Sequence, residues 1–288
     1  MITARTVAEL EAALALCPAN RGFVPTMGGL HEGHMALVDA ARQACATVVA
    51  SIYVNPLQFG PGEDFTAYPR TVEEDRARLA AHGVDVLFLP TDRDIYPRGR
   101  DLQTQVHVPV LSDTLCGRFR PGHFHGVATV VARLLGLVRP AVCYLGKKDY
   151  QQWRLITQMV ADLALPVVVT GVDTVRAPDG LALSTRNTYL TDAQRGIAPA
   201  LYQTLVAGAE RVGAGESYTA VEEASVAALT ALGFVPDYVA VRRALDLAAP
   251  AADDRALVIL AAARLGTTRL IDNHEFRRSP GTDGGHWQ

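Results

Sequence analysis

Short apolar runs alternate along the first part of the chain with longer segments in which apolar residues recur every three or four positions. The runs are bounded by turn residues, a pattern typical of strands that are buried on both faces of a parallel sheet. The pattern predicts strands at Phe23–Thr26, Val48–Val54, Val84–Leu89, Ala141–Leu145 and Pro166–Val172.

The segments between these runs have the spacing of amphipathic helices. In the first of them, Leu37, Val38, Ala41, Ala44 and Cys45 share one helical face. The spacing predicts helices at His34–Ala46, Val72–His82, Val127–Leu137 and Gln151–Leu163. Because strands and helices alternate, we expect an α/β fold with a Rossmann-like, doubly wound parallel sheet over residues 1–175.

The pattern changes after Val175. Residues 192–232 are alanine-rich and helical, with a break at GAGES (213–217). A strand follows at DYVAV (237–241), and residues 256–272 predict two short strands around a Gly-Thr turn. Because strands cluster here, we expect a smaller C-terminal α+β domain over residues 176–288, which ends in a mobile tail, SPGTDGGHWQ.

Composition limits the classes of partner and the compartment. The formal net charge is −3, which gives no support to binding nucleic acid non-specifically. The four cysteines are scattered and form no CxxC pair. This pattern indicates small buried residues in a reducing compartment. Glu9 and Glu11 interrupt the N-terminal apolar run, and no stretch reaches the length of a membrane span. We therefore expect a soluble cytoplasmic protein without nucleic-acid or membrane partners.

The first candidate for chemistry is the turn Met27–His34, between a predicted strand and a helix. Ligands of open parallel sheets bind beyond the carboxyl ends of strands, where a helix N-terminus favours anions. Gly28 and Gly29 allow close approach of the backbone, and His31 and His34 lie about one helical turn apart. HEGH has one residue too few for the zinc-protease HExxH motif. Two interpretations stay open: ordinary histidines that cap a helix, or the nucleotide-binding HxGH element.

Two later turns carry residues suited to phosphate. Gly146, Lys147, Lys148 and Asp149 follow the predicted strand 141–145, with Asp149 placed as an N-cap. Ser184, Thr185 and Arg186 could contact phosphate through two hydroxyls and a guanidinium. Both segments are equally compatible with ordinary polar turns. The chain has neither a GxxxxGK[ST] phosphate loop nor a GxGxxG fingerprint.

Two further loops suit a small polar substrate. Residues 53–71 combine Asn55 and Gln58 with Tyr68 and Arg70 among prolines, glycines and aromatic residues. RPGHFHG (120–126) contains His123 and His125, which could form a metal pair, although no cluster with zinc-ligand spacing stands nearby in the sequence.

Five blocks occur in a fixed order: PTMGGLHEGHMALV, YVNPLQFGPGEDFTAYPRT, RPGHFHGVATVVARLL, LGKKDYQQW and TVRAPDGLALSTRN. Together, over roughly residues 20–190, they resemble the pantothenate synthetase (pantoate–β-alanine ligase) family of the HxGH nucleotidyltransferase superfamily. The resemblance implies that ATP and pantoate form a pantoyl adenylate with release of pyrophosphate. β-Alanine then attacks the acyl carbon, giving pantothenate and AMP.

The resemblance also implies roles for residues of the matching blocks. His34 is the residue usually assigned as proton donor, and His31, Lys148 and Arg186 join it as catalytic residues. Gln58 and Gln152 would bind pantoate, and Gln58 is also a candidate for contact with β-alanine. The implied ATP site consists of Met27, Gly28, Gly29, Leu30, His31, Glu32, Gly33, His34, Gly146, Lys147, Lys148, Asp149, Val175, Leu183, Ser184, Thr185 and Arg186.

The resemblance implies Mg²⁺ carried on the ATP phosphates, with Glu74 and Asp75 as water-mediated helpers, and a homodimer. The sequence departs from the usual family pattern at Leu183, Thr185, Lys147 and Asp173. Two alternatives remain open, namely another HxGH adenylyltransferase and a non-catalytic nucleotide-binding module.

Overall fold

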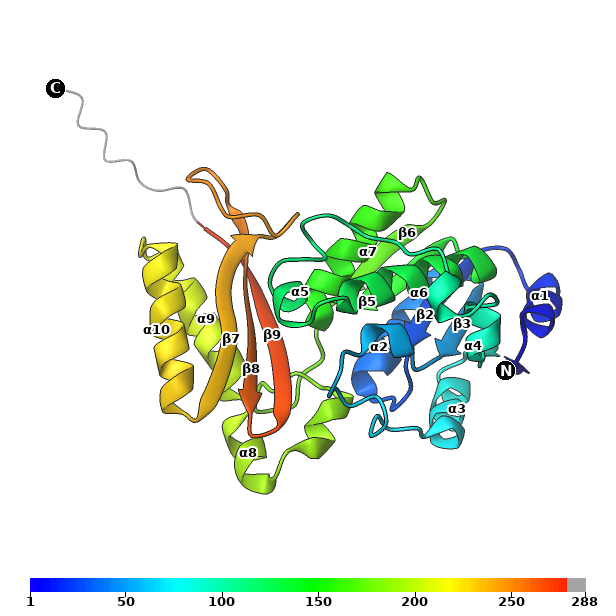
Figure 1. The fold of residues 1–288 in the computed structure, drawn as a ribbon, viewed down its shortest axis with the longest axis horizontal. Coiled ribbons are helices and arrows are strands. Elements are labelled where there is room, and N and C mark those ends of the chain that lie inside the picture. Colours follow the sequence, from blue (N-terminus) through cyan, green and yellow to red (C-terminus); the bar gives the residue numbers. More distant parts are fainter. Residues whose placement is uncertain (279–288) are drawn as a thin grey trace. The chain divides into compact units, whose positions relative to one another are not determined.

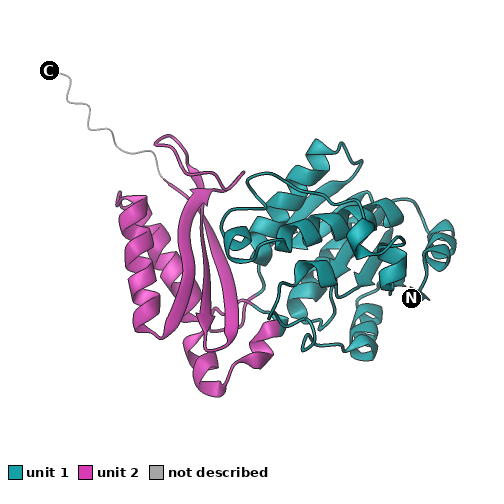
Figure 2. Cartoon of the chain, in the orientation of Figure 1, with its two compact units in different colours: residues 1–175, 183–185 teal, residues 176–182, 186–288 magenta. Residues whose placement is uncertain are grey.

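The computed structural model describes residues 1–278, so the expected tail of residues 279–288 lies outside the described part. The chain divides into two compact units (Figure 2). Unit 1 comprises residues 1–175 and 183–185, and unit 2 comprises residues 176–182 and the chain from Arg186 onward. The segment Leu183–Thr185 therefore belongs with the first unit, whereas the sequence pattern predicted a single boundary after residue 175, with this segment in the second domain.

Unit 1 is built on a six-stranded, fully parallel sheet in the order β1-β4-β3-β2-β5-β6 (Figure 1). This topology confirms the predicted fold class. The three-residue β1 was not predicted, because so short an apolar run carries no periodic signal. The strands are β1 (Ile2–Ala4), β2 (Arg21–Thr26), β3 (Thr47–Ile52), β4 (Val86–Phe88), β5 (Val142–Gly146) and β6 (Val168–Val172).

Helices cover the sheet because both of its faces are apolar. All six residues of β3 are buried, as expected of a central strand. Val38 and Ala41 of α2 pack with Val24 and Val48 of the strands in one core. Complete burial of such a valine or leucine side chain stabilises the fold by about 1.5–3 kcal/mol. The helices of unit 1 are α1 (Val7–Ala15), α2 (Glu32–Ala44), α3 (Val72–Ala81), α4 (Asp92–Ile95), α5 (Cys116–Phe119), α6 (His123–Val138) and α7 (Tyr150–Asp162).

Helix α6 begins four residues earlier than the sequence pattern indicated. Its N-cap, Gly122, has a φ of +81°, a conformation that favours glycine, so the helix already begins at His123. His123 and His125 consequently lie in the first helical turn and not in the preceding loop.

The chain order reverses beside β2, which pairs with β3 on one side and with β5 on the other. Such a reversal is the switch point at which open parallel sheets bind ligands. Because Gly22 pairs with Val142 and Phe23 with Cys143, β2 and β5 end at the same edge of the sheet. The turns after these two strands are therefore neighbours.

Unit 2 contains an antiparallel sheet of β7 (Phe234–Arg243), β8 (Ala256–Leu265) and β9 (Thr268–Arg277). The helices α8 (Asp192–Ile197), α9 (Ala200–Gly213) and α10 (Tyr218–Ala231) precede it. The predicted break at 213–217 is confirmed, since Ser217 caps α10 by accepting a hydrogen bond from the Ala220 amide. Leu205 of α9 and Ile259 of β8 lie in a core of this unit. Among residues 1–278, no helix has both the length and the apolar character needed to cross a membrane.

Candidate active site

The turn after β2 has a left-handed backbone that a buried carboxylate holds in place. Gly28 and Gly29 have φ angles of +86° and +63°. Asp75 of α3, only 1% exposed, accepts hydrogen bonds from the amides of Gly29 (2.9 Å) and Leu30 (2.8 Å). The Thr71 hydroxyl donates to the same carboxylate at 3.2 Å. Asp75 therefore anchors the glycine turn, a different role from the metal helper suggested by the sequence.

The two histidines of the turn are linked to its backbone. His31 is the N-cap of α2, and its Nδ1 accepts a hydrogen bond from the Gly33 amide at 3.1 Å. The Nδ1 of His34 accepts one from the His31 amide at 3.3 Å. Because each Nδ1 is an acceptor, the proton of each neutral imidazole is on Nε2. The helix cap and the HxGH element, weighed above as alternatives, are thus the same structure.

Both histidines are neutral at physiological pH. Burial, followed by the positive charge of Lys148, lowers the pKa of His31 to about 4. Burial, followed by the neighbouring His31, lowers the pKa of His34 to about 3. Their ring centroids are 4.2 Å apart. The N-terminus of α2 therefore carries two imidazoles whose Nε2–H groups can donate to an anionic ligand without bringing a positive charge.

The turn after β5 supplies the positive charge. Residues Lys147–Asp149 form a short 3₁₀ helix between β5 and α7. The Lys148 ammonium lies 3.7 Å from the Asp149 carboxylate, and its charge affects the pKa of both His31 and His34.

The neighbouring Lys147 forms an ion pair with Asp173, and both residues depart from the usual family pattern. Its ammonium lies 2.8 Å from the carboxylate of Asp173, and 5.6 Å from the ring centroid of Trp153. Two departures from the usual family pattern, at positions 147 and 173, therefore form an ion pair with each other. Because Asp173 is exposed, this pair contributes little to the stability of the fold.

The segment 183–185 returns to the glycine turn. The Leu183 amide donates to the carbonyl of Val175 at 3.0 Å, and the Thr185 hydroxyl donates to the carbonyl of Gly29 at 3.0 Å. A Cβ at Gly29 would come within 2.5 Å of Thr185 Cγ2, so this close approach requires glycine. The structure thus brings three of the predicted residues to the HxGH turn. Arg186 follows directly as the first residue of its segment in unit 2.

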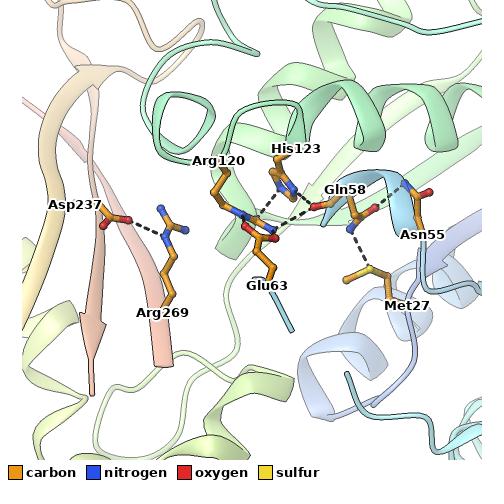
Figure 3. A network of polar contacts seen from close by, with 8 residues as sticks. All are labelled: Met27, Asn55, Gln58, Glu63, Arg120, His123, Asp237 and Arg269. Atoms are coloured by element: carbon orange, nitrogen blue, oxygen red, sulfur yellow. Dashed lines mark hydrogen bonds and ion pairs between the residues drawn. The ribbon is translucent and has the colours of Figure 1, made fainter. Parts of the chain in front are cut away.

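Gln58 connects the turn after β3 to the turn after β2 (Figure 3). It ends a 3₁₀ helix (Pro56–Gln58) whose N-cap is Asn55. The Gln58 Nε2 lies 3.0 Å from the sulfur of Met27, and its Oε1 accepts a hydrogen bond from Asn55 Nδ2 at 3.1 Å. Tyr96 in turn donates to Asn55 Oδ1 at 2.7 Å. The Gln58 amide is therefore held in one orientation beside the HxGH turn.

A second network fixes the backbone of Gln58, also shown in Figure 3. Burial, followed by the charge of Arg120, lowers the pKa of His123 to about 3. The Arg120 guanidinium contacts Nε2 of this neutral ring at 3.0 Å, so Nδ1 carries the proton and donates to the Gln58 carbonyl at 2.8 Å. Glu63 accepts from Arg120 Nε at 2.7 Å. The sequence pattern does not reveal this use of Arg120 and Glu63, because 57 residues separate them and no spacing rule joins them.

Figure 3 also draws the ion pair between Arg269 and Asp237, at 2.7 Å, which belongs to unit 2 alone.

Of the two adjacent glutamines at the start of α7, Gln152 is half-buried and Gln151 is buried. Gln151 donates to the carbonyls of Leu111 (2.8 Å) and Thr114 (2.7 Å) and accepts from the Cys116 amide (3.0 Å). Gln151 thus holds a loop in place, while Gln152 is the one available to a ligand. Glu74 lies exposed on α3.

A turn with two histidines at the switch point of a parallel sheet, with a lysine on the adjoining turn, defines an α/β protein with an anion-binding site at the carboxyl edge of its sheet. A family model described as Pantoate-beta-alanine ligase matches residues 2–275. The chain is 55% identical to the pantothenate synthetase of Methylococcus capsulatus, over 93% of this chain and 95% of that protein. The chain belongs to the pantoate-beta-alanine ligase family, which confirms the resemblance drawn from the sequence blocks.

Solved structures agree with this assignment. The pantothenate synthetase of Thermus thermophilus superposes with a TM-score of 0.89 at 49% identity, covering 96% of this chain and 99% of that one. The pantoate-beta-alanine ligase of Francisella tularensis, complexed with beta-gamma ATP and beta-alanine, gives a TM-score of 0.81 at 34% identity, covering 96% and 97%.

Proposed function

We propose that this chain condenses pantoate with β-alanine, at the expense of ATP, through a pantoyl adenylate. The observation that carries the proposal is the pair of Nε2–H donors of His31 and His34 at the start of α2. Gln58 contacts Met27 of the same turn. The names of the similar proteins supply the substrates: pantoate and β-alanine in the family description, and ATP with β-alanine in the Francisella tularensis complex.

In the first step the carboxylate of pantoate attacks the α-phosphorus of ATP. A new P–O bond forms, the bond to pyrophosphate breaks, and negative charge grows on the phosphate oxygens. The Nε2–H groups of His31 and His34, together with Lys148, stabilise that charge. Because burial keeps His34 neutral, we propose that it acts as a hydrogen-bond donor and not as a charged acid.

In the second step the amine of β-alanine attacks the acyl carbon of the adenylate. The amide bond forms, AMP leaves, and the amine loses a proton. Neither step requires a nucleophilic side chain, since adenylation itself activates the acid. The amide of Gln58 can donate and accept at once, which suits the hydroxyl groups of pantoate, and Gln152 is proposed to assist it.

The remaining residues of the proposed ATP site come from the turns described above. The glycine turn supplies Met27–His34, and the turn after β5 supplies Gly146–Asp149. We assign Val175 and Leu183–Thr185 to the same site because Thr185 and Leu183 are bonded back to Gly29 and Val175. Arg186 is proposed to contact phosphate through its guanidinium.

Mg²⁺ is proposed to arrive bound to the ATP phosphates. Mg²⁺ prefers oxygen ligands and retains several waters. Both oxygens of Asp75 already accept amide hydrogen bonds, and Glu74 lies exposed on α3. The Asp75 carboxylate therefore does not fit as a direct ligand, Glu74 is proposed to act through water, and the ion would neutralise phosphate charge from the ATP side.

Three further predictions remain proposals: that unit 2, which contains Arg186, acts as a lid that excludes water from the adenylate, that the protein works in the cytoplasm, as its composition suggests, and that it is a homodimer, as the family resemblance suggests. Light scattering of the purified chain tests the dimer, since the mass in solution should be twice 30.9 kDa.

An assay with each substrate omitted in turn tests the reaction. Pyrophosphate should form when ATP and pantoate are both present, and pantothenate should form only after β-alanine is added. Pyrophosphate release with a nucleotide or a cofactor precursor in place of pantoate would instead indicate another adenylyltransferase. Absence of turnover with bound ATP would indicate a non-catalytic module.

A further inference from the structure

Two histidines and an aspartate from different segments of unit 1 converge at a place that the proposed reaction does not use. They are His125 in the first turn of α6, and His107 and Asp113 in the loop that precedes α5. One potential ligand atom of each residue lies within 4.8 Å of the other two. The sequence suggested His123 and His125 as a metal pair, but His123 faces Gln58 and His125 faces His107.

The two imidazoles make direct contact through nitrogen atoms. The Nε2 of His125 lies against the Nδ1 of His107, and the ring centroids are 4.5 Å apart. The other nitrogen of His107, Nε2, lies 3.4 Å from the carboxylate of Asp113. Two facing nitrogen lone pairs repel each other unless a proton or a metal ion lies between them. The carboxylate beside the pair adds a negative charge that favours a cation.

The backbone around the three residues is fixed independently of them. The Val106 amide donates to the Thr129 hydroxyl of α6 at 2.9 Å, so the loop is attached to the helix one turn beyond His125. On the other side, the Gln151 amide holds the carbonyls of Leu111 and Thr114, which flank Asp113. The loop therefore presents His107 and Asp113 to His125 without relying on their own contacts.

We propose that His107, Asp113 and His125 bind one divalent transition-metal ion. Two imidazoles with one carboxylate match the donors preferred by Zn²⁺ and its neighbours, and not the all-oxygen set of Mg²⁺ or Ca²⁺. Tetrahedral zinc with bonds of about 2.0–2.1 Å needs its ligand atoms about 3.4 Å apart. The side chains of His107 and Asp113 are 43% and 57% exposed, so they are free to rotate into that arrangement, and water completes the coordination.

Calorimetric titration of the full chain with Zn²⁺ tests the proposal. The wild type should bind one ion at this site, and either His107→Gln or His125→Gln should weaken that binding at least about tenfold. A bound ion should also raise the melting temperature of the wild type, because it binds the folded chain, and this shift should vanish in the double variant.

Two controls separate this site from other histidines. His82→Gln is the matched control, since His82 contacts the carboxylate of Asp39 at 2.8 Å on the surface and, among residues 1–278, belongs to no such cluster. His31→Asn tests the active-site pair. Both variants should retain the zinc site. Absence of zinc binding by the wild type, equal binding by His107→Gln and His125→Gln, or loss of binding in His31→Asn would overturn the proposal and leave a hydrogen bond between the two imidazoles.

Discussion

His34 shows how one side chain receives its chemistry from its surroundings. Its Nδ1 is occupied by the His31 amide, and burial lowers its pKa to about 3, so only a neutral Nε2–H remains to meet a ligand. His34→Ala should lower kcat about 10²–10³-fold, the loss typical of one donor to a transition state, while circular dichroism shows an intact fold. His34→Gln, which keeps an N–H donor, should lose less. Near-normal turnover of the alanine variant would remove His34 from the mechanism.

The low pKa values of His31, His34 and His123 also predict how stability depends on pH. In the unfolded chain each ring binds a proton near pH 6.5, whereas in the folded chain the pKa values are about 4, 3 and 3. Below pH 6.5 the unfolded state therefore holds more protons. The free energy of unfolding should fall as the pH is lowered toward 4, by up to about 1.4 kcal/mol per pH unit for each histidine.

Urea unfolding at a series of pH values above and below 6.5 measures this slope. His123→Gln, which retains a donor for the Gln58 carbonyl but does not titrate, should reduce the slope and leave the stability above pH 6.5 largely unchanged. A slope that is identical in wild type and variant would show that the ring of His123 is protonated in the folded state as readily as in the unfolded one.

Gln58 is the residue whose loss should discriminate between substrates. Its amide is held beside Met27 by Asn55, and its backbone carbonyl by His123. Gln58→Ala removes the amide and leaves the carbonyl in place, so the KM for pantoate should rise much more than the KM for ATP. Steady-state kinetics with each substrate varied in turn provides the comparison. Equal rises in both KM values would indicate a distorted loop instead of a lost contact.

At the scale of elements, five of the six strands of the parallel sheet could be predicted, and the short edge strand β1 could not. The strands β2, β3 and β5 are buried apolar runs, and the helices α2 and α7 follow them with clear periodicity, so pattern alone located them. Strand β1 was missed because residues 2–4 form a strand only by pairing with β4, a non-local interaction. The start of α6 was predicted four residues too late. Gly122, in a left-handed conformation, caps the helix at His123, whereas the apolar periodicity begins only at Val127.

The contact between α3 and the glycine turn provides a prediction at this scale. Asp75 and Glu74 are adjacent acidic residues of α3, yet Asp75 is buried under two amide hydrogen bonds and Glu74 is exposed. Asp75→Asn leaves one of the two loop amides without a good acceptor, so we expect a loss of about 1–3 kcal/mol in unfolding free energy and a raised KM for ATP.

Glu74→Gln is the matched control for that experiment. Glu74 is exposed in the first turn of α3, where its charge interacts with the helix dipole, so the change should lower stability by less than about 1 kcal/mol and leave the KM for ATP unchanged. The anchoring role of Asp75 is contradicted if Asp75→Asn keeps wild-type stability and alters only the dependence of activity on Mg²⁺.

For the molecule as a whole, the sequence indicated which blocks form the proposed site but not how they are held. HxGH, GKKD and Gln58 could be proposed from local pattern and resemblance, because each follows a strand of the sheet. Asp75 and the pair Arg120–Glu63 could not, because their partners lie 45 to 57 residues away along the chain. Supporting contacts of this kind arise only when the whole unit folds.

The two units have separate apolar cores, which predicts that each can lose stability by itself. Leu205 lies in the core of unit 2 and Leu79 in that of unit 1, both fully buried. Either leucine-to-alanine change should cost about 2–5 kcal/mol, with the loss confined to its own unit. Hydrogen exchange followed by mass spectrometry should show faster exchange in α9 and β8 for Leu205→Ala, and in β2 and β3 for Leu79→Ala. If either variant accelerates exchange equally in both units, the chain unfolds as one cooperative body and the two cores are not energetically independent.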